Sequence, residues 1–282
     1  MPRFCILGLD AMDLRVARRL DLRNLLLDYN GELEIPLYDK YRTGEKIAFS
    51  PVIWASFLTG KEPKEHGNYT FYKYDNPLVQ WASEKFRGHW LLRGKGELAR
   101  KLGLKKKASK ARGKTIFDAH ENKAVQFLGL NWSPKKWSGL CLAYEKEDWS
   151  QEKLYKKFVE LFKEVTFQGK EPLDALNEWW LGGESTIGYY TPFLDFCQHL
   201  FPGSPLIDEA YREADKFAGL LRKVCPQILI VADHGFEGPN HSKVGYWSST
   251  RDFKVSKITD FYDYFVSDKE EVLNRLKKLG YI

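Results

Sequence analysis

The chain has 282 residues, of which 43% are hydrophobic, and carries a formal net charge of +6. That length and composition allow one substantial core, and we expect a single domain over residues 1–282. The longest apolar runs, such as residues 228–232, are far shorter than the roughly 20 residues of a membrane helix, and the first residues do not resemble a signal peptide. These features exclude a membrane-spanning protein and predict a soluble, cytoplasmic one.

The first predicted elements form a β-loop-α unit. Residues 3–9 have the composition of a buried strand that ends at Asp10. Helical spacing follows over residues 13–20, with Asp13 placed to cap the helix. Further along, Ser50 precedes Pro51, which is typical of a helix start, so a capping role is one reading of Ser50.

The middle of the chain carries a pronounced basic segment. Between Lys85 and Lys114 there are twelve Lys or Arg residues and one acid, Glu97. Apolar periodicity is weak there, so we predict a small basic insert, a flap over residues 71–114. A solvated flap is the simpler interpretation; attraction of a phosphate-bearing substrate, nucleic acid or an anionic membrane face is the alternative.

Further β-α units follow. A short helical pattern over residues 115–121 precedes a strand-like run over 124–130, and another strand is expected over 185–190. The clearest unit comes last, with an amphipathic helix over 206–224 and a strand over 227–232. Strands that alternate with helices predict an α/β three-layer sandwich around a mostly parallel sheet.

Candidate metal ligands cluster in two places besides Asp10. Asp195 and His199 are four residues apart, which places both side chains on one side of a helical turn, and Asp233-His234 is followed by His241. Carboxylate oxygen and neutral imidazole suit zinc or manganese. Each pair alone is a weak signal, because such Asp residues are often caps and single His residues are often packed in the core.

The segment around Ser50 makes the interpretation specific. The chain reads Ser50-Pro-Val-Ile-Trp-Ala-Ser-Phe-Leu-Thr59-Gly60 and then Pro63-Lys-Glu-His66-Gly67. This pattern resembles the nucleophile segment of the type I phosphodiesterase and nucleotide pyrophosphatase branch of the alkaline phosphatase superfamily. The other Asp and His motifs come in the order that the family has them, so the resemblance spans nearly the whole chain.

The resemblance implies an alkaline-phosphatase-like fold and a site with two divalent metal ions, with zinc expected first and manganese next. It implies that Ser50 is the nucleophile and that His66 is a structural turn residue. One ion would be held by Asp10, Asp233, His234 and the Ser50 oxygen, and the other by Asp195, His199 and His241.

We therefore expect a metal-dependent phosphohydrolase that forms a phosphoserine-type intermediate on Ser50. The branch it resembles favours phosphodiesters or pyrophosphates over monoesters, so the partner is a small phosphate ester. One alternative is a phosphotransferase or phosphomutase that uses the same serine. The other is a nucleic-acid or anionic-surface binding protein with a structural metal site. The sequence specifies neither the substrate nor the oligomeric state.

Four cysteines, Cys5, Cys141, Cys197 and Cys225, lie far apart without a CxxC pair. This spacing suggests neither a disulfide framework nor a thiolate zinc site, so we expect reduced thiols.

Overall fold

The computed structural model describes residues 3–39, 44–74, 76, 106–118 and 121–266. Six strands form a central sheet in the order β2-β10-β7-β1-β6-β5. Four adjacent strands, β7, β1, β6 and β5, all run in the same direction. β10 runs antiparallel to both of its neighbours, β2 and β7. The strands are β1 (Phe4–Leu9), β2 (Tyr29–Glu34), β5 (Asn122–Gln126), β6 (Thr186–Thr191), β7 (Gln227–Ala232) and β10 (Val244–Ser249).

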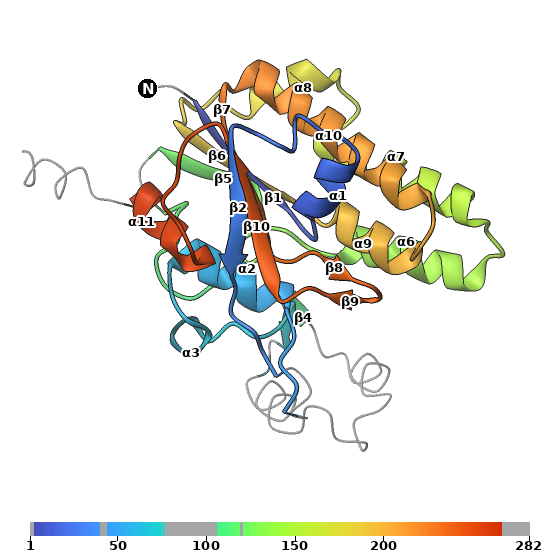
Figure 1. Cartoon of the computed structure of the whole chain (residues 1–282), viewed down its shortest axis with the longest axis horizontal. Coiled ribbons are helices and arrows are strands. Elements are labelled where there is room, and N and C mark those ends of the chain that lie inside the picture. Colours follow the sequence, from blue (N-terminus) through green and yellow to red (C-terminus); the bar gives the residue numbers. More distant parts are fainter. Residues whose placement is uncertain (1–2, 40–43, 75, 77–105, 119–120, 267–282) are drawn as a thin grey trace, which may run out of the picture.

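Helices cover both faces of this sheet, as Figure 1 shows. On one face lie α1 (Leu14–Arg19), α6 (Lys135–Lys146), α7 (Gln151–Phe167), α8 (Pro172–Glu178), α9 (Phe193–Leu200) and α10 (Leu206–Val224). On the other lie α2 (Ser50–Thr59), α3 (Pro63–His66), the 3₁₀ helix η2 (Ile258–Asp260) and α11 (Phe261–Val266). The predicted three-layer α/β arrangement with a mostly parallel sheet is confirmed.

The clearest sequence patterns gave the most accurate bounds. The helix predicted over residues 206–224 and the strand over 227–232 are α10 and β7, residue for residue. α10 buries Tyr211, Ala214, Phe217, Ala218 and Leu221, which recur every three or four residues along one face of the helix. β1 and β7 are buried along nearly their whole length because helices cover both faces of the sheet.

In the middle of the chain one predicted element is wrong and another has different bounds. No helix forms over the described residues between 115 and 121; instead the Asp118 carboxylate accepts hydrogen bonds from the Thr115 N–H and hydroxyl, which closes a turn. The strand expected over 124–130 begins earlier, at Asn122, and ends at Gln126. It stops there because the Phe127 N–H donates to the Asn131 side chain, 2.8 Å away.

The predicted basic insert is described only at its two ends. There β3 (Tyr72–Tyr74) and β4 (Lys106–Ala108) pair as an antiparallel ribbon, separate from the central sheet. Residues 77–105, which include most of the basic segment, lie outside the described residues.

His66 is a structural residue, as expected. It is fully buried at the end of α3, where its Nδ1 accepts a hydrogen bond from the Asn68 N–H (3.0 Å). Its Nε2 therefore carries the proton of the neutral ring and donates to Ser56 Oγ in α2, 3.1 Å away. His66 thus ties the turn after α2 back onto that helix.

This arrangement predicts a pH dependence of stability. Burial lowers the pKa of His66 from 6.5 to about 4. The unfolded chain therefore takes up a proton at a higher pH than the folded chain, so stability that is present above pH 6.5 is lost as the pH falls towards 4. Between pH 6.5 and pH 4 the free energy of unfolding decreases by about 3 kcal/mol through this histidine.

Urea unfolding of metal-free protein at pH 7, 6 and 5 tests this prediction against the variant His66→Asn. The Asn side chain can still accept from the Asn68 N–H but does not titrate. The free energy of unfolding of the variant should fall less steeply with decreasing pH than that of the wild type. The two slopes should differ by at most about 1.4 kcal/mol per pH unit. Parallel slopes for the two proteins would contradict the assignment.

Within the described ranges, no helix has the length and apolar character required to cross a bilayer. All four cysteines are free, and Cys5, Cys197 and Cys225 are buried.

Candidate metal centre

The predicted ligands converge because their strands are neighbours in the sheet. Asp10 follows β1, Asp233 and His234 follow β7, and Asp195 lies in the first turn of α9, just after β6. β1 lies between β6 and β7, and all three run in the same direction. Their carboxyl ends therefore meet at one edge, where α/β sheets form their sites.

Ser50 approaches this edge from α2. It is the first residue of the helix, and the capping position belongs to Phe49, so the interpretation of Ser50 as the cap is wrong. The hydroxyl instead faces the cluster, with Oγ 3.4 Å from Nε2 of His234. Ser50 is only 5% exposed.

The first group of ligands comprises Asp10, Asp233 and His234, all buried. Nε2 of His234 lies 3.4 Å from Oδ1 of Asp10 and 3.5 Å from Oδ2 of Asp233. The other Asp233 oxygen is 3.4 Å from the N–H of Ala11. This group matches the protein ligands expected for one ion.

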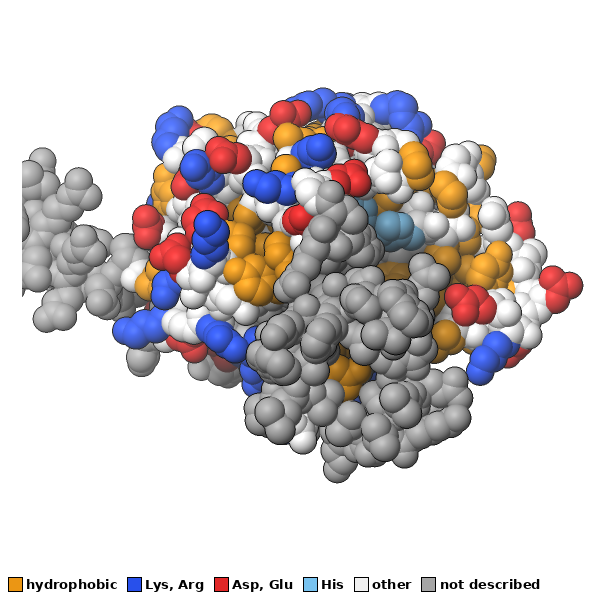
Figure 2. Space-filling model, turned by 90° about the horizontal axis from the view of Figure 1, so that it is seen from below, with side chains coloured by type: hydrophobic (Ala, Val, Ile, Leu, Met, Phe, Trp, Pro, Cys, Tyr) orange, Lys and Arg blue, Asp and Glu red, His pale blue; other side chains and the backbone are white. Residues whose placement is uncertain are grey.

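The second group comprises Asp195, His199 and His241. Nε2 of His199 lies 3.3 Å from Oδ1 of Asp195 and 2.9 Å from Nε2 of His241, and the distance from His241 Nε2 to Asp195 Oδ1 is 3.6 Å. His241 comes from β9 (Asn240–His241), which pairs with β8 (Phe236–Glu237). Histidine side chains reach the molecular surface in Figure 2.

His234 also belongs with Asp195 and His241, because ligand atoms of these three residues lie within 4.8 Å of one another. The rings of His234 and His241 are stacked with their centroids 3.8 Å apart. The two groups are therefore contiguous, with His234 between them.

Backbone carbonyls fix the tautomers of two of these histidines. Nδ1 of His234 is 3.1 Å from the carbonyl of Gly235, and Nδ1 of His241 is 3.2 Å from that of Ala48. Each neutral ring donates its Nδ1 proton to the carbonyl, which leaves the Nε2 lone pair directed at the cluster.

Three buried carboxylate oxygens at the centre, Oδ1 of Asp10, Oδ1 of Asp195 and Oδ2 of Asp233, accept no hydrogen bond from a described residue. Burial, together with the neighbouring carboxylate, raises the pKa of Asp10 well above its usual value. Burial also raises the pKa of Asp233, to about 7. Unpaired buried carboxylates are costly, and a bound cation removes that cost.

The spacing of the ligand atoms fits such a cation. Ligands about 2.0–2.1 Å from a tetrahedral zinc ion are about 3.4 Å apart. The 2.9–3.6 Å separations within both groups bracket that value. The residues present therefore suit divalent cations at two adjacent positions.

Two residues at the centre were not predicted from the sequence. The Tyr190 hydroxyl, from β6, donates to Oδ2 of Asp10. The Phe236 ring packs edge-on against both His199 and His241, with centroids 4.9 and 5.1 Å away. Neither has a sequence signal of its own, since a tyrosine in a buried strand and a phenylalanine in a hairpin are usual core residues.

The sheet and this cluster define an α/β protein with a carboxylate and histidine centre for divalent cations. The model of the type I phosphodiesterase / nucleotide pyrophosphatase family matches residues 47–269, and the chain belongs to that family, within the alkaline phosphatase superfamily. A search of curated protein sequences finds no significant match.

Solved structures of two related enzymes resemble the chain at low identity. Murine ectonucleotide pyrophosphatase / phosphodiesterase 5 is 12% identical, with a TM-score of 0.48, over 83% of this chain and 57% of that one. Phosphonoacetate hydrolase from Sinorhizobium meliloti 1021, in complex with phosphonoacetate, is 15% identical, with a TM-score of 0.42, over 83% and 56%. The chain therefore spans under three fifths of the length of these proteins.

Proposed function

We propose that the protein is a two-metal phosphohydrolase that cleaves phosphodiesters or pyrophosphates, with Ser50 as nucleophile. The observation that carries this proposal is the convergence of acceptor atoms. Three buried carboxylate oxygens that accept no hydrogen bond from a described residue lie beside the Nε2 atoms of His234 and His241. A cation bound between these acceptor atoms would stabilise them.

Asp10, Asp233 and His234 would hold one ion with the Ser50 oxygen, and Asp195, His199 and His241 the other. When bound, the ions would lower the pKa of the serine hydroxyl and neutralise charge on the phosphoryl oxygens. Zinc is our first expectation and manganese the second, since both accept carboxylate and imidazole ligands.

The chain contributes the nucleophile and its placement. Ser50 Oγ would attack phosphorus, a new O–P bond would form, and the bond to the leaving alcohol or phosphate would break. The hydroxyl proton would pass to solvent, because the bound cations would lower the pKa of the hydroxyl and His234 Nε2 would be occupied as a ligand. Water would then hydrolyse the phosphoserine. The amino terminus of α2, where Ser50 lies, favours the anionic phosphoryl group.

The experiment is metal analysis combined with turnover. Protein purified without chelator should contain about two divalent ions per chain by mass spectrometry. With added zinc or manganese it should hydrolyse bis-p-nitrophenyl phosphate faster than p-nitrophenyl phosphate. Faster cleavage of the monoester would overturn the substrate preference. Metal binding without cleavage of either ester would favour the binding-protein alternative, and failure to bind metal would overturn the proposal.

A second assay, with an added alcohol, distinguishes hydrolysis from transfer of the phosphoryl group. With an added alcohol acceptor, a hydrolase releases inorganic phosphate as the main final product from a monoester, whereas a phosphotransferase yields the phosphorylated alcohol. We expect phosphate release to dominate.

A further inference from the structure

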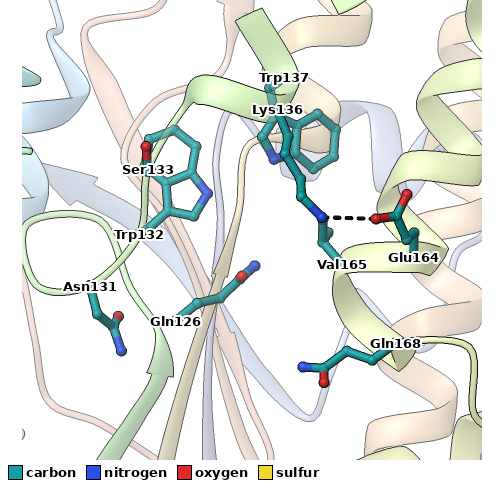
Figure 3. A pocket seen from close by; sticks show the side chains of 9 residues that line it. All are labelled: Gln126, Asn131, Trp132, Ser133, Lys136, Trp137, Glu164, Val165 and Gln168. Carbon is teal, nitrogen blue, oxygen red and sulfur yellow. Dashed lines mark hydrogen bonds and ion pairs between the residues drawn. The ribbon is translucent and has the colours of Figure 1, made fainter. Parts of the chain in front are cut away.

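A cleft lies between the loop after β5 and the helices α6 and α7 (Figure 3). Its volume of about 430 Å³ falls in the range of small-molecule sites. None of the residues that line it belongs to the candidate metal centre.

The wall of the cleft is rigid and includes two indole rings. Trp132 packs edge-on against Tyr190, with centroids 5.0 Å apart, and Trp137 packs against Phe158 and Phe196. Trp132 is only 5% exposed and Trp137 only 2%. Neither ring therefore offers an open face on which a nucleobase could stack.

The indole edges offer hydrogen-bond donors instead. Neither Trp132 Nε1 nor Trp137 Nε1 has an acceptor among the described residues, and neither nitrogen is fully buried. Figure 3 shows the Trp132 ring nitrogen turned toward the open space. A ligand in the cleft needs acceptor atoms to pair with these N–H groups.

Two carboxamides add donors and acceptors. Gln126 donates through Nε2 to the Tyr190 carbonyl, 2.9 Å away, so its orientation is fixed and its oxygen remains available as an acceptor. Gln168, which ends α7 with a left-handed backbone (φ 53°), extends its side chain toward the same space in Figure 3. Hydroxyl groups, which both donate and accept, match this combination.

The charge of the cleft is balanced. Its lysine, Lys136, pairs with its acid, Glu164, at 2.8 Å across the rim. The lining therefore has no net charge to attract an anion, which disfavours phosphate. We propose that the cleft is a binding site for a neutral polyhydroxylated compound, a sugar or polyol, distinct from the metal centre.

The test uses the indole N–H signals of the full-length, ¹⁵N-labelled protein in the presence of chelator, so that the metal centre is not involved. The Trp132 signal is identified by its loss in Trp132→Phe. myo-Inositol and methyl α-D-glucoside are titrated separately, with adenosine and inorganic phosphate as comparison ligands. We expect saturable shifts of the Trp132 signal with at least one polyol and none with phosphate or adenosine.

Variants on α7 locate the site. Gln168→Ala should raise the polyol Kd about two- to tenfold through loss of one or two hydrogen bonds. Glu160→Gln, on the same helix but outside the cleft, should leave it unchanged. If Trp132→Phe does not fold, the side-chain amide signals of Gln168, absent from Gln168→Ala, serve as the reporter.

Several outcomes would overturn the proposal. They are the absence of shifts with both polyols, shifts of these signals by adenosine or phosphate alone, and equal Kd values for Gln168→Ala and Glu160→Gln. Because the measurement needs neither metal nor turnover, its failure would leave the proposed phosphohydrolase function untouched.

Discussion

Ser50→Ala is expected to reduce turnover of bis-p-nitrophenyl phosphate by at least about a thousandfold, the scale of losing a nucleophile. The substitution removes the proposed attacking oxygen and nothing that the fold depends on. The Ser50 side chain makes no capping hydrogen bond, and its described contacts are with His234 and Asp233. Metal content should remain near that of the wild type, because the other six predicted ligands are intact.

Ser56→Ala is the matched control for this prediction. Ser56 lies in the same helix and is fully buried, but its hydroxyl contacts His66 and not the cluster. The loss of a buried hydrogen bond should cost about 1–3 kcal/mol of stability. Its kcat should nevertheless stay within a few-fold of wild type at a temperature where it is folded. Near-normal turnover by Ser50→Ala would contradict the proposed mechanism.

Substitution of the central histidine should have a larger effect on metal content than substitution of a peripheral one. Nε2 of His234 belongs to both candidate ligand groups, whereas His241 belongs only to the second. We expect about two ions per chain in the wild type, about one in His241→Ala and fewer than one in His234→Ala. Mass spectrometry of desalted protein measures all three.

The variant His66→Asn provides the histidine control, because His66 is bound to α2 and Asn68 and lies outside the cluster. It should retain two ions. If His234→Ala and His241→Ala lost the same amount of metal, the shared position of His234 would be refuted. Activity should fall at least about a hundredfold in both variants, since each removes a proposed ligand.

The elements with strong local signals could be predicted from the sequence. α10 has a long apolar stripe and a proline just after its end, and β7 is a continuous apolar run, so both bounds were right. The helix expected over residues 115–121 failed because the Asp118 side chain bonds the backbone and side chain of Thr115 and favours a turn. Such competition depends on geometry that a short pattern does not specify.

The pairing of β2 with β10 could not be predicted from the sequence either. β2 and β10 pair with each other across more than 200 residues of chain, and β2 is exposed at most positions. Pairing of this kind is decided by which strands become neighbours in the folded protein, and half-exposed strands lack the continuous apolar run that makes β7 recognisable.

The sequence by itself identified the residues of the candidate centre. Asp10 and Asp233-His234 follow predicted strands, and groups at the ends of parallel strands can meet at one edge. The full set of Asp10, Ser50, Asp195, His199, Asp233, His234 and His241 was implied by the resemblance of the Ser50 segment to the family.

Only the tertiary structure decided how these residues relate to one another. It placed His234 between the two ligand groups, fixed the tautomers of His234 and His241 through the carbonyls of Gly235 and Ala48, and brought Tyr190 onto Asp10. The contact of His241 with Ala48, for example, joins residues 193 positions apart. These contacts depend on strand order and on the turns that follow the strands, and local sequence preferences do not encode either.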